Sequence, residues 1–142
     1  MTKTLFMLRG LPASGKSTLR KQLLTDPDLA PIVAVNKDEI RKSLGITPGD
    51  FAREKEVLQA ETEAIQDAID QGISLILDNT HNAPKHIIRY SQLAAKSRYE
   101  FKLIDLSNVP LEECIRRDSM RVGGERVGEA VIRRMWEQSY KS

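Results

Sequence analysis

A glycine-rich segment near the start of the chain constrains the fold more than any other feature. The segment reads Gly10-Leu11-Pro12-Ala13-Ser14-Gly15-Lys16-Ser17 and follows the apolar run Leu5-Phe6-Met7-Leu8. Leu19, Leu23 and Leu24 follow at helical spacing, so a strand, a tight turn and a helix succeed one another. This order fits the pattern G-x-x-x-x-G-K-S/T, in which backbone N–H groups converge on phosphate. A chance Gly/Ser turn ahead of a helix is the alternative, and the flanking strand and helix argue against it.

Each fixed position of this pattern has a chemical role. Gly10 and Gly15 permit backbone angles and close approaches that a side chain would block. Lys16 supplies a positive charge for the β- and γ-phosphates, and the Ser17 hydroxyl is placed to bind Mg²⁺. We therefore expect Mg²⁺ and ATP, or another nucleoside triphosphate, since no signature separates ATP from GTP. The residues expected to contact the nucleotide here are Gly10, Ala13, Ser14, Gly15, Lys16, Ser17 and Thr18.

Length and composition set the outer limits of the interpretation. With 142 residues, we expect one domain over residues 1–142 with a single sizeable core. The net charge of +2 is too small to indicate a nucleic-acid partner by itself. No apolar stretch is long enough to cross a bilayer, and the first residues lack a signal-peptide pattern. The single cysteine, Cys114, suits a reducing cytosol and is expected to be half-buried on a helix. These features predict a cytoplasmic protein without a membrane partner.

Short apolar runs alternate with helical segments along the whole chain. This alternation is typical of an α/β fold, and we expect a four-stranded parallel sheet with helices on both faces. The expected strands are Thr4–Arg9, Ile32–Val35, Ile73–Leu77 and Tyr99–Leu106. The expected helices are Lys16–Thr25, one entered through Asn36–Arg41, 51–71, Pro84–Ser97, Pro110–Met120 and Glu129–Tyr140.

Functional residues of open parallel sheets collect beyond the carboxyl ends of the strands. In this chain those ends carry the phosphate-binding segment, Asn36–Arg41, Asp78–Asn82 and the region near Ser107. We therefore expect that one cleft can contain all four.

Asp38 is the first candidate for chemistry outside the glycine-rich segment. It lies just after the second strand, at the start of a helix, and Arg41 follows one turn later on the same helix face. Phosphoryl transfer to a hydroxyl needs a group that orients and deprotonates the acceptor, and a carboxylate is the usual one. The alternative is a structural role, since a carboxylate at a helix N-terminus is favoured by the helix dipole alone.

Asp78 ends the third expected strand. An acidic residue there commonly holds Mg²⁺ or positions water in phosphate-loop enzymes. A turn or capping role is an equally good interpretation, because Asp-Asn-Thr suits a turn. His81 nearby is interpreted as a loop histidine, and two histidines with one cysteine argue against a zinc site.

A run of arginines, Arg116–Arg121, precedes Gly123-Gly124 and Arg126. A charge-rich helix end is often only a solvated face. Arginines ahead of a glycine hinge also describe a helical lid that closes over a nucleotide. Arg117 and Arg121 are four residues apart, so both can face one site and neutralise charge on the transferred phosphoryl group.

Together these residues resemble the kinase domain of the phage polynucleotide 5′-kinases, within the wider group of small P-loop kinases. The resemblance extends in family order over nearly all of the chain, and the P-loop alone is specific only to a superfamily. Its four blocks are Gly10–Thr18, Asn36-Lys37-Asp38-Glu39-Ile40-Arg41, Asp78-Asn79-Thr80, and Arg117-Asp118-Ser119-Met120-Arg121 with the final helix Val131–Met135.

The resemblance implies a P-loop kinase fold and a role for each matching residue. Asp38 would be the general base that activates a 5′-hydroxyl, and Arg41 would bind the 3′-phosphate of the acceptor. Asp78 would support the site from the third strand. Arg121 would contact the donor phosphates beside Arg117, and Arg126 could take part of that role. The implied acceptor is single-stranded or end-exposed DNA or RNA, in the host cytoplasm if a phage encodes the protein.

Two other functions stay open on the sequence. A kinase of a small-molecule hydroxyl, or of a hydroxylated modified base in DNA, fits the low net charge and the 5% aromatic content. A nucleotide-dependent switch without catalysis is the third possibility, but such a module needs neither a base nor lid arginines. The oligomeric state is open as well. Trp136 and Tyr140 could mark a contact, although ordinary helix packing is the commoner role.

Overall fold

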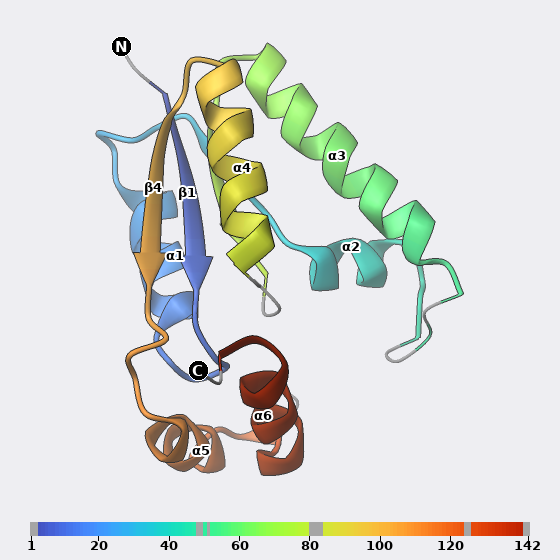
Figure 1. Cartoon of the computed structure of the whole chain (residues 1–142), viewed down its shortest axis with the longest axis vertical. Helices are drawn as coiled ribbons and strands as arrows, with labels where there is room; N and C mark the ends of the chain where they lie inside the picture. Colours follow the sequence, from blue (N-terminus) through green and yellow to red (C-terminus); the bar gives the residue numbers. More distant parts are fainter. Residues whose placement is uncertain (1–2, 48–49, 51, 80–83, 124–125, 141–142) are drawn as a thin grey trace.

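The computed structural model describes residues 3–47, 50, 52–79, 84–123 and 126–140 (Figure 1). Phe51, Thr80, His81, Asn82 and Gly124, which belong to features predicted above, lie outside the described residues. Within the described part, no helix is long and apolar enough to cross a membrane.

Four parallel strands form one sheet in the order β2-β3-β1-β4. The strands are β1 (Thr4–Arg9), β2 (Ile32–Val35), β3 (Ser74–Asp78) and β4 (Glu100–Asp105). The helices are α1 (Lys16–Thr25), α2 (Lys37–Ser43), α3 (Glu54–Asp70), α4 (Pro84–Lys96), α5 (Leu111–Ser119) and α6 (Glu129–Met135), which continues as the π-helical segment η2 (Trp136–Tyr140).

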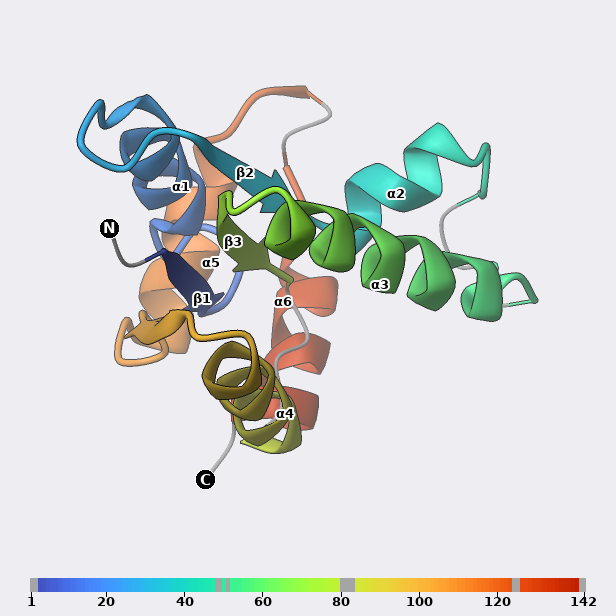
Figure 2. The same cartoon turned by 90° about the horizontal axis from the view of Figure 1, so that it is seen from above.

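The central strands β1 and β3 are buried on both faces. Successive side chains of a strand point to opposite sides, so each face of the sheet packs against its own set of helices. On one face, Leu5 and Met7 pack with Ile65 of α3 and Tyr90 of α4. On the other face, the alternate residues of β1 pack against α1 through Leu19 and its neighbours. Figure 2 shows α1 on one side of the sheet, with α3 and α4 on the other. The predicted α/β fold with helices on both faces is confirmed.

A third apolar cluster lies beyond the carboxyl ends of the strands, where α5 and α6 pair (Figure 1). Its buried members are Leu11 of the phosphate-binding segment, Cys114 of α5 and Ile132 of α6. Cys114 is fully buried rather than half-buried as expected. The two helices therefore pack directly against the glycine-rich turn.

Several element bounds differ from the sequence prediction. Strand β3 runs over Ser74–Asp78, one residue later than the predicted Ile73–Leu77. Helix α5 ends at Ser119, two residues before Arg121, and Pro110 is its N-cap instead of its first residue. The predicted helix 129–140 is α-helical only to Met135 and continues as a π-helix.

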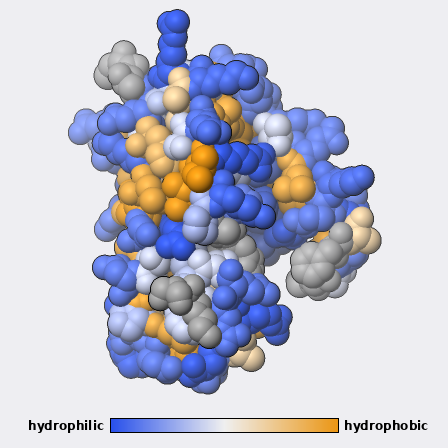
Figure 3. Space-filling view, viewed as in Figure 1, coloured by the Kyte–Doolittle hydropathy of each residue, from blue (hydrophilic) through white to orange (hydrophobic). Residues whose placement is uncertain are grey.

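The surface of the face seen in Figure 3 is mostly hydrophilic. Apolar atoms gather over the β4 edge of the sheet, where Leu103 is 37% exposed. Among the described residues, β4 is the edge strand on this side of the sheet.

Candidate active site

The glycine-rich segment folds as a loop that leaves the first turn of α1 open to an anion. Gly15 is the N-cap of α1 at φ 109°, and Ala13 is also left-handed at φ 66°. Gly10 has φ 156°, and a Cβ there would lie 2.6 Å from Ser14 Oγ and 3.0 Å from Leu106 Cβ, so this position favours glycine. In the described part of the chain no side chain caps α1, and the buried Ser14 Oγ has no hydrogen-bond partner. Free donors at a helix N-terminus fit a phosphate group.

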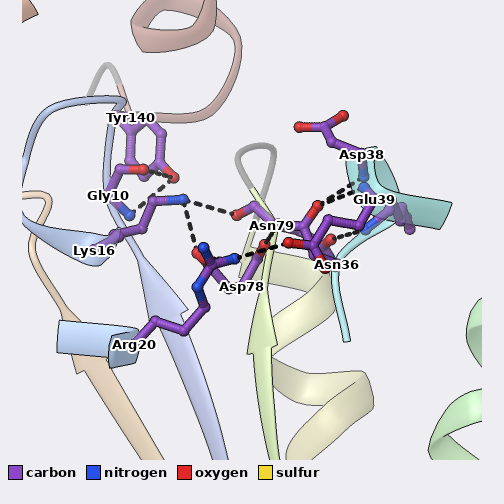
Figure 4. Close-up of polar contacts among 10 residues, drawn as sticks. Gly10, Lys16, Arg20, Asn36, Asp38, Glu39, Asp78, Asn79 and Tyr140 are labelled. Atoms are coloured by element: carbon purple, nitrogen blue, oxygen red, sulfur yellow. Dashed lines mark hydrogen bonds and ion pairs between the residues drawn. The ribbon is translucent and has the colours of Figure 1, made fainter. Parts of the chain in front are cut away.

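Lys16 projects from this loop toward the end of β3. Its Nζ is 3.2 Å from Asp78 Oδ1 and 3.5 Å from the Asn79 carbonyl oxygen, to which it donates (Figure 4). Arg20, one turn further along α1, lies 3.4 Å from Asp78 Oδ2 and 3.5 Å from Glu39 of α2. The Lys16 side chain is only 7% exposed, and its charge is balanced by the equally buried Asp78.

Asn36 fixes the start of α2 against the end of β3. Its Oδ1 accepts the N–H groups of Asp38 at 2.8 Å and of Glu39 at 3.1 Å, as a helix N-cap does. Its Nδ2 donates to the carbonyl oxygen of Asp78. Figure 4 shows the resulting arrangement, in which the start of α2 faces the Lys16 side of the cleft.

Asp38 and Arg41 lie on one face of α2, as predicted. Arg41 Nη1 is 2.9 Å from Asp38 Oδ1, and its Nη2 is 2.8 Å from Glu54 Oε1 of α3. The contact with Glu54 was not predicted, because α3 starts a dozen residues later and no local pattern links the two helices. Arg41 thus orients the exposed Asp38 carboxylate and is itself held by α3.

These elements enclose a cavity of about 370 Å³. The predicted residues among those that line it are Ala13, Lys16, Ser17, Asp38, Asp78 and Arg121. An adjoining cavity of about 220 Å³ is lined by Ala13, Gly15, Ser17, Thr18, Arg117 and Arg121. Ser107 hydrogen-bonds to Arg9 at the end of β1. Three of the four predicted segments therefore contribute to the first cavity.

The predicted lid arginines meet at the second cavity although only one of them is helical. Arg117 is in α5, and its Nη1 donates to the carbonyl oxygen of Ala13 at 3.4 Å. Arg121 follows the helix and lies 3.7 Å from Asp118. Arg126 is exposed.

Asp118 was missed by the sequence analysis because its partners lie nine and ten residues later, in the segment before α6. It is 2% exposed and accepts the N–H groups of Val127 at 2.9 Å and Gly128 at 2.8 Å. Burial by itself raises the pKa of Asp118. The two N–H donors and the nearby Arg121 and Arg126 outweigh this effect, so the pKa is lowered. Asp118 therefore anchors the segment between α5 and α6.

Tyr140 was also missed as a site residue. Its hydroxyl accepts the N–H of Gly10 at 3.1 Å and donates to the Gly10 carbonyl at 3.1 Å (Figure 4). The guanidinium of Arg9 lies 4.6 Å from the ring centroid and donates to the Ser139 carbonyl at 2.9 Å. Tyr140 lies 130 positions from Gly10, and no local sequence pattern indicates a contact over that distance. Only the fold shows that the two residues meet.

Ser17 and Asp78 were the predicted Mg²⁺ ligands, and both line the larger cavity. The described residues contain no group of three or more His, Cys, Asp or Glu side chains suited to hold a metal by themselves. Mg²⁺ commonly binds one or two protein oxygens and completes its shell with substrate phosphates and water. Ser17 and Asp78 fit this mode of binding. They do not fit a site in which protein side chains supply all the ligands.

This chain belongs to the AAA domain family, whose pattern matches residues 5–141. No curated protein matches the chain.

Three solved structures show the same fold. A chain of the Pnkp1/Rnl/Hen1 RNA repair complex has a TM-score of 0.78 and 20% identity, covering 96% of this chain and 44% of that one. The APS kinase CysC of Mycobacterium tuberculosis, in complex with AMPPNP and APS, has a TM-score of 0.59 and 22% identity over 84% of this chain and 69% of that one. A gluconokinase from Sinorhizobium meliloti 1021 has a TM-score of 0.57 and 13% identity, covering 99% of this chain and 75% of that one.

The chain spans less than half the length of the RNA repair chain that it matches. At these identities the likeness establishes the fold, which is that of the P-loop kinases.

Proposed function

We propose that this protein is a kinase that transfers the γ-phosphoryl group of ATP to a 5′-hydroxyl end of DNA or RNA. The observation that carries the proposal is the single cavity lined by Lys16 and Ser17 on one side and by Asp38 on the other. A donor site and a carboxylate facing the same space are what phosphoryl transfer to a hydroxyl requires.

On the donor side, Lys16 and the N–H groups at the start of α1 bind the phosphates. Ser17 and Asp78, which line the same cavity, would hold Mg²⁺, which would neutralise charge on the bound phosphates. The phosphates compete with Asp78 for Lys16, since the two side chains are paired in the structure described above. Arg117 and Arg121 neutralise the charge that spreads over the transferred group.

On the acceptor side, Asp38 accepts the proton of the attacking hydroxyl. The hydroxyl oxygen then bonds to the γ-phosphorus, and the bond from that phosphorus to the β–γ bridging oxygen breaks to release ADP. Arg41 binds the 3′-phosphate of the acceptor nucleotide with donors that its contacts with Asp38 and Glu54 hold in a fixed direction.

A small-molecule hydroxyl, or a hydroxylated base in DNA, is the second candidate acceptor. The likeness of fold to an APS kinase and to a gluconokinase favours a small molecule. The 5% aromatic content favours it too, because single-stranded nucleic acid usually stacks on aromatic side chains.

The test is a transfer assay with ATP and Mg²⁺, in which 5′-hydroxyl DNA and RNA oligonucleotides compete with a panel of small hydroxyl compounds. Asp38→Asn should lower the rate about 10²–10⁴-fold while ATP affinity stays unchanged, because the variant loses only the proton acceptor. Asp67→Asn, on the exposed side of α3, is the matched control and should keep its rate. Absence of transfer to every oligonucleotide by a wild-type protein that binds ATP would contradict the proposal.

A further inference from the structure

A carboxyl group with no role in the mechanism above lies in the interior between α3 and α4. Glu61 of α3 is fully buried. Its Oε1 accepts the hydroxyl of Tyr90 at 3.1 Å, and its Oε2 accepts Nδ2 of Asn79 at 3.0 Å. Desolvating a buried carboxyl group is costly even when it is hydrogen-bonded, and an apolar replacement of such a group together with its partners is often no less stable. Stability therefore gives a weak reason for this network as a whole, although loss of Glu61 alone would take an acceptor from two buried donors.

Asn79 connects this group to both sides of the candidate active site. Its Oδ1 accepts the N–H of Lys37 at 3.0 Å, and its carbonyl oxygen accepts from Lys16 Nζ at 3.5 Å. Figure 4 shows Asn79 between Lys16 and the start of α2. An asparagine amide can rotate by half a turn, which exchanges its oxygen and nitrogen. The acceptor Glu61 selects the orientation in which the oxygen faces Lys37, because the opposite one would bring two donors together.

The hydrogen bond from the Lys37 N–H to Asn79 Oδ1 helps to hold the first turn of α2 in place. Lys37 is the first residue of this helix, and the next two N–H groups are bound by Asn36. The two asparagines hold three successive N–H groups against the end of β3. Asp38 is the second of the three residues, so its position depends on both.

We propose that Glu61 is a positioning residue that acts through Asn79. By fixing the Asn79 amide, it sets the place of Asp38 and Lys16 relative to each other, without touching a substrate. Its importance for rate rests on the proposed kinase function, whereas its effect on α2 does not.

Three variants separate this role from packing. Glu61→Leu removes the acceptor of Asn79. Glu61→Gln restores it, because the Gln oxygen can accept from Asn79 while its amide donates to the Tyr90 oxygen. Tyr90→Phe is the matched control, since it removes the other hydrogen bond to Glu61 in an equally buried place and leaves Asn79 bound.

The first measurement is amide hydrogen exchange at Lys37 by NMR on the whole protein. Exchange should become at least about tenfold faster in Glu61→Leu, because the N–H loses a fixed acceptor, and should stay unchanged in Glu61→Gln and Tyr90→Phe. Equal exchange in Glu61→Leu and wild type would overturn the proposal, and this readout needs no acceptor substrate.

The second measurement is the transfer rate on whichever acceptor the wild type phosphorylates. Glu61→Leu should lower kcat about 10- to 100-fold with the KM for ATP changed less than about threefold, because misplacing a reacting group slows the step more than it weakens binding. Glu61→Gln should recover most of the rate. Equal losses in Glu61→Leu and Tyr90→Phe would assign the effect to packing and overturn the proposal. If the wild type transfers to no acceptor, the proposed function fails while the exchange experiment still decides the role of Glu61.

Should Glu61→Leu not fold, Glu61→Met provides the same test, because its side chain also lacks the carboxyl oxygens and Asn79 keeps the oxygen that binds Lys37. Glu61→Met should give the same faster exchange at Lys37, and unchanged exchange would overturn the proposal. Where Glu61→Leu and Asn79→Ala both fold, their double variant should be no slower in transfer than Asn79→Ala, because the two residues act in series.

Discussion

At the scale of single residues, Asp118 shows how one buried carboxylate can hold a whole segment. It receives two backbone N–H groups, one from Val127 and one from the N-cap of α6, Gly128. Charged acceptors of backbone N–H groups make strong hydrogen bonds, and a buried donor that loses its acceptor costs the full desolvation of that donor. The position of the segment after Arg121 therefore depends on this side chain being ionised.

Asp118→Asn should lower the free energy of unfolding by about 1–3 kcal/mol at pH 7, because the new amide nitrogen faces an N–H donor. The pKa of Asp118 is lowered in the folded protein, so its contribution is present above the unfolded pKa of about 3.9 and is lost as pH falls through the lower folded value. The difference between wild type and variant should therefore shrink in acid. Denaturant titrations at pH 7 and at low pH measure it, with exposed Asp67→Asn as control. A difference independent of pH would contradict this account.

At the scale of elements, η2 determines how the phosphate-binding loop begins. The hydroxyl of Tyr140 holds both the N–H and the carbonyl of Gly10, and Arg9 is held against the same ring. A loop that is already ordered binds phosphate without first losing conformational freedom. We therefore expect η2 to favour nucleotide binding through its contacts with the loop's first residue.

Tyr140→Phe should weaken ATP binding several-fold and reduce stability by about 1 kcal/mol, because two hydrogen bonds to Gly10 are lost. Tyr99→Phe is a suitable comparison, since the Tyr99 hydroxyl binds the backbone carbonyls of Ala68 and Ile73 far from the loop. Tyr99→Phe should lower the free energy of unfolding by a similar amount and leave the affinity for ATP unchanged. Calorimetric titration with ATP measures the affinities. Equal ATP affinities in the two variants would show that the Tyr140 contact serves packing alone.

The sequence predicted the elements whose signals are local. The bounds of β1, α1 and β2 agree because the glycine-rich pattern, Asp26-Pro27 and a short apolar run mark their ends within a few residues. The contacts of Glu61 and Tyr140 were not predictable, because their partners lie 18 and 130 positions away and only the packing of the sheet brings them together. The roles given to Asp38, Arg41 and Arg121 stay predictions.

At the scale of the whole molecule, the α5–α6 layer shares its core with the loop that it covers. Leu11, two residues after the end of β1, packs with Cys114 and Ile132, so this layer contacts the loop that leaves the sheet. Cooperative unfolding follows where buried contacts connect all layers of a small protein. The single tryptophan, Trp136, packs against this cluster and reports on it.

We expect urea unfolding followed by Trp136 fluorescence to coincide with unfolding followed by far-UV circular dichroism, which reports on all helices and the sheet. The two midpoints should agree within about 0.2 M, as for a two-state protein. An earlier fluorescence transition would mean that α5 and α6 unfold as a separate unit.

The bond between Tyr140 and Gly10 also bears on the order in which the protein is made. Gly10 is synthesised 130 residues before Tyr140. At roughly 5–20 residues per second, the interval between them is on the order of ten seconds. During that time the growing chain has its phosphate-binding motif but lacks the hydroxyl that fixes the motif's first residue. On the proposed function, nucleotide affinity should therefore reach its full value only after the segment that carries Tyr140 has left the ribosome and docked.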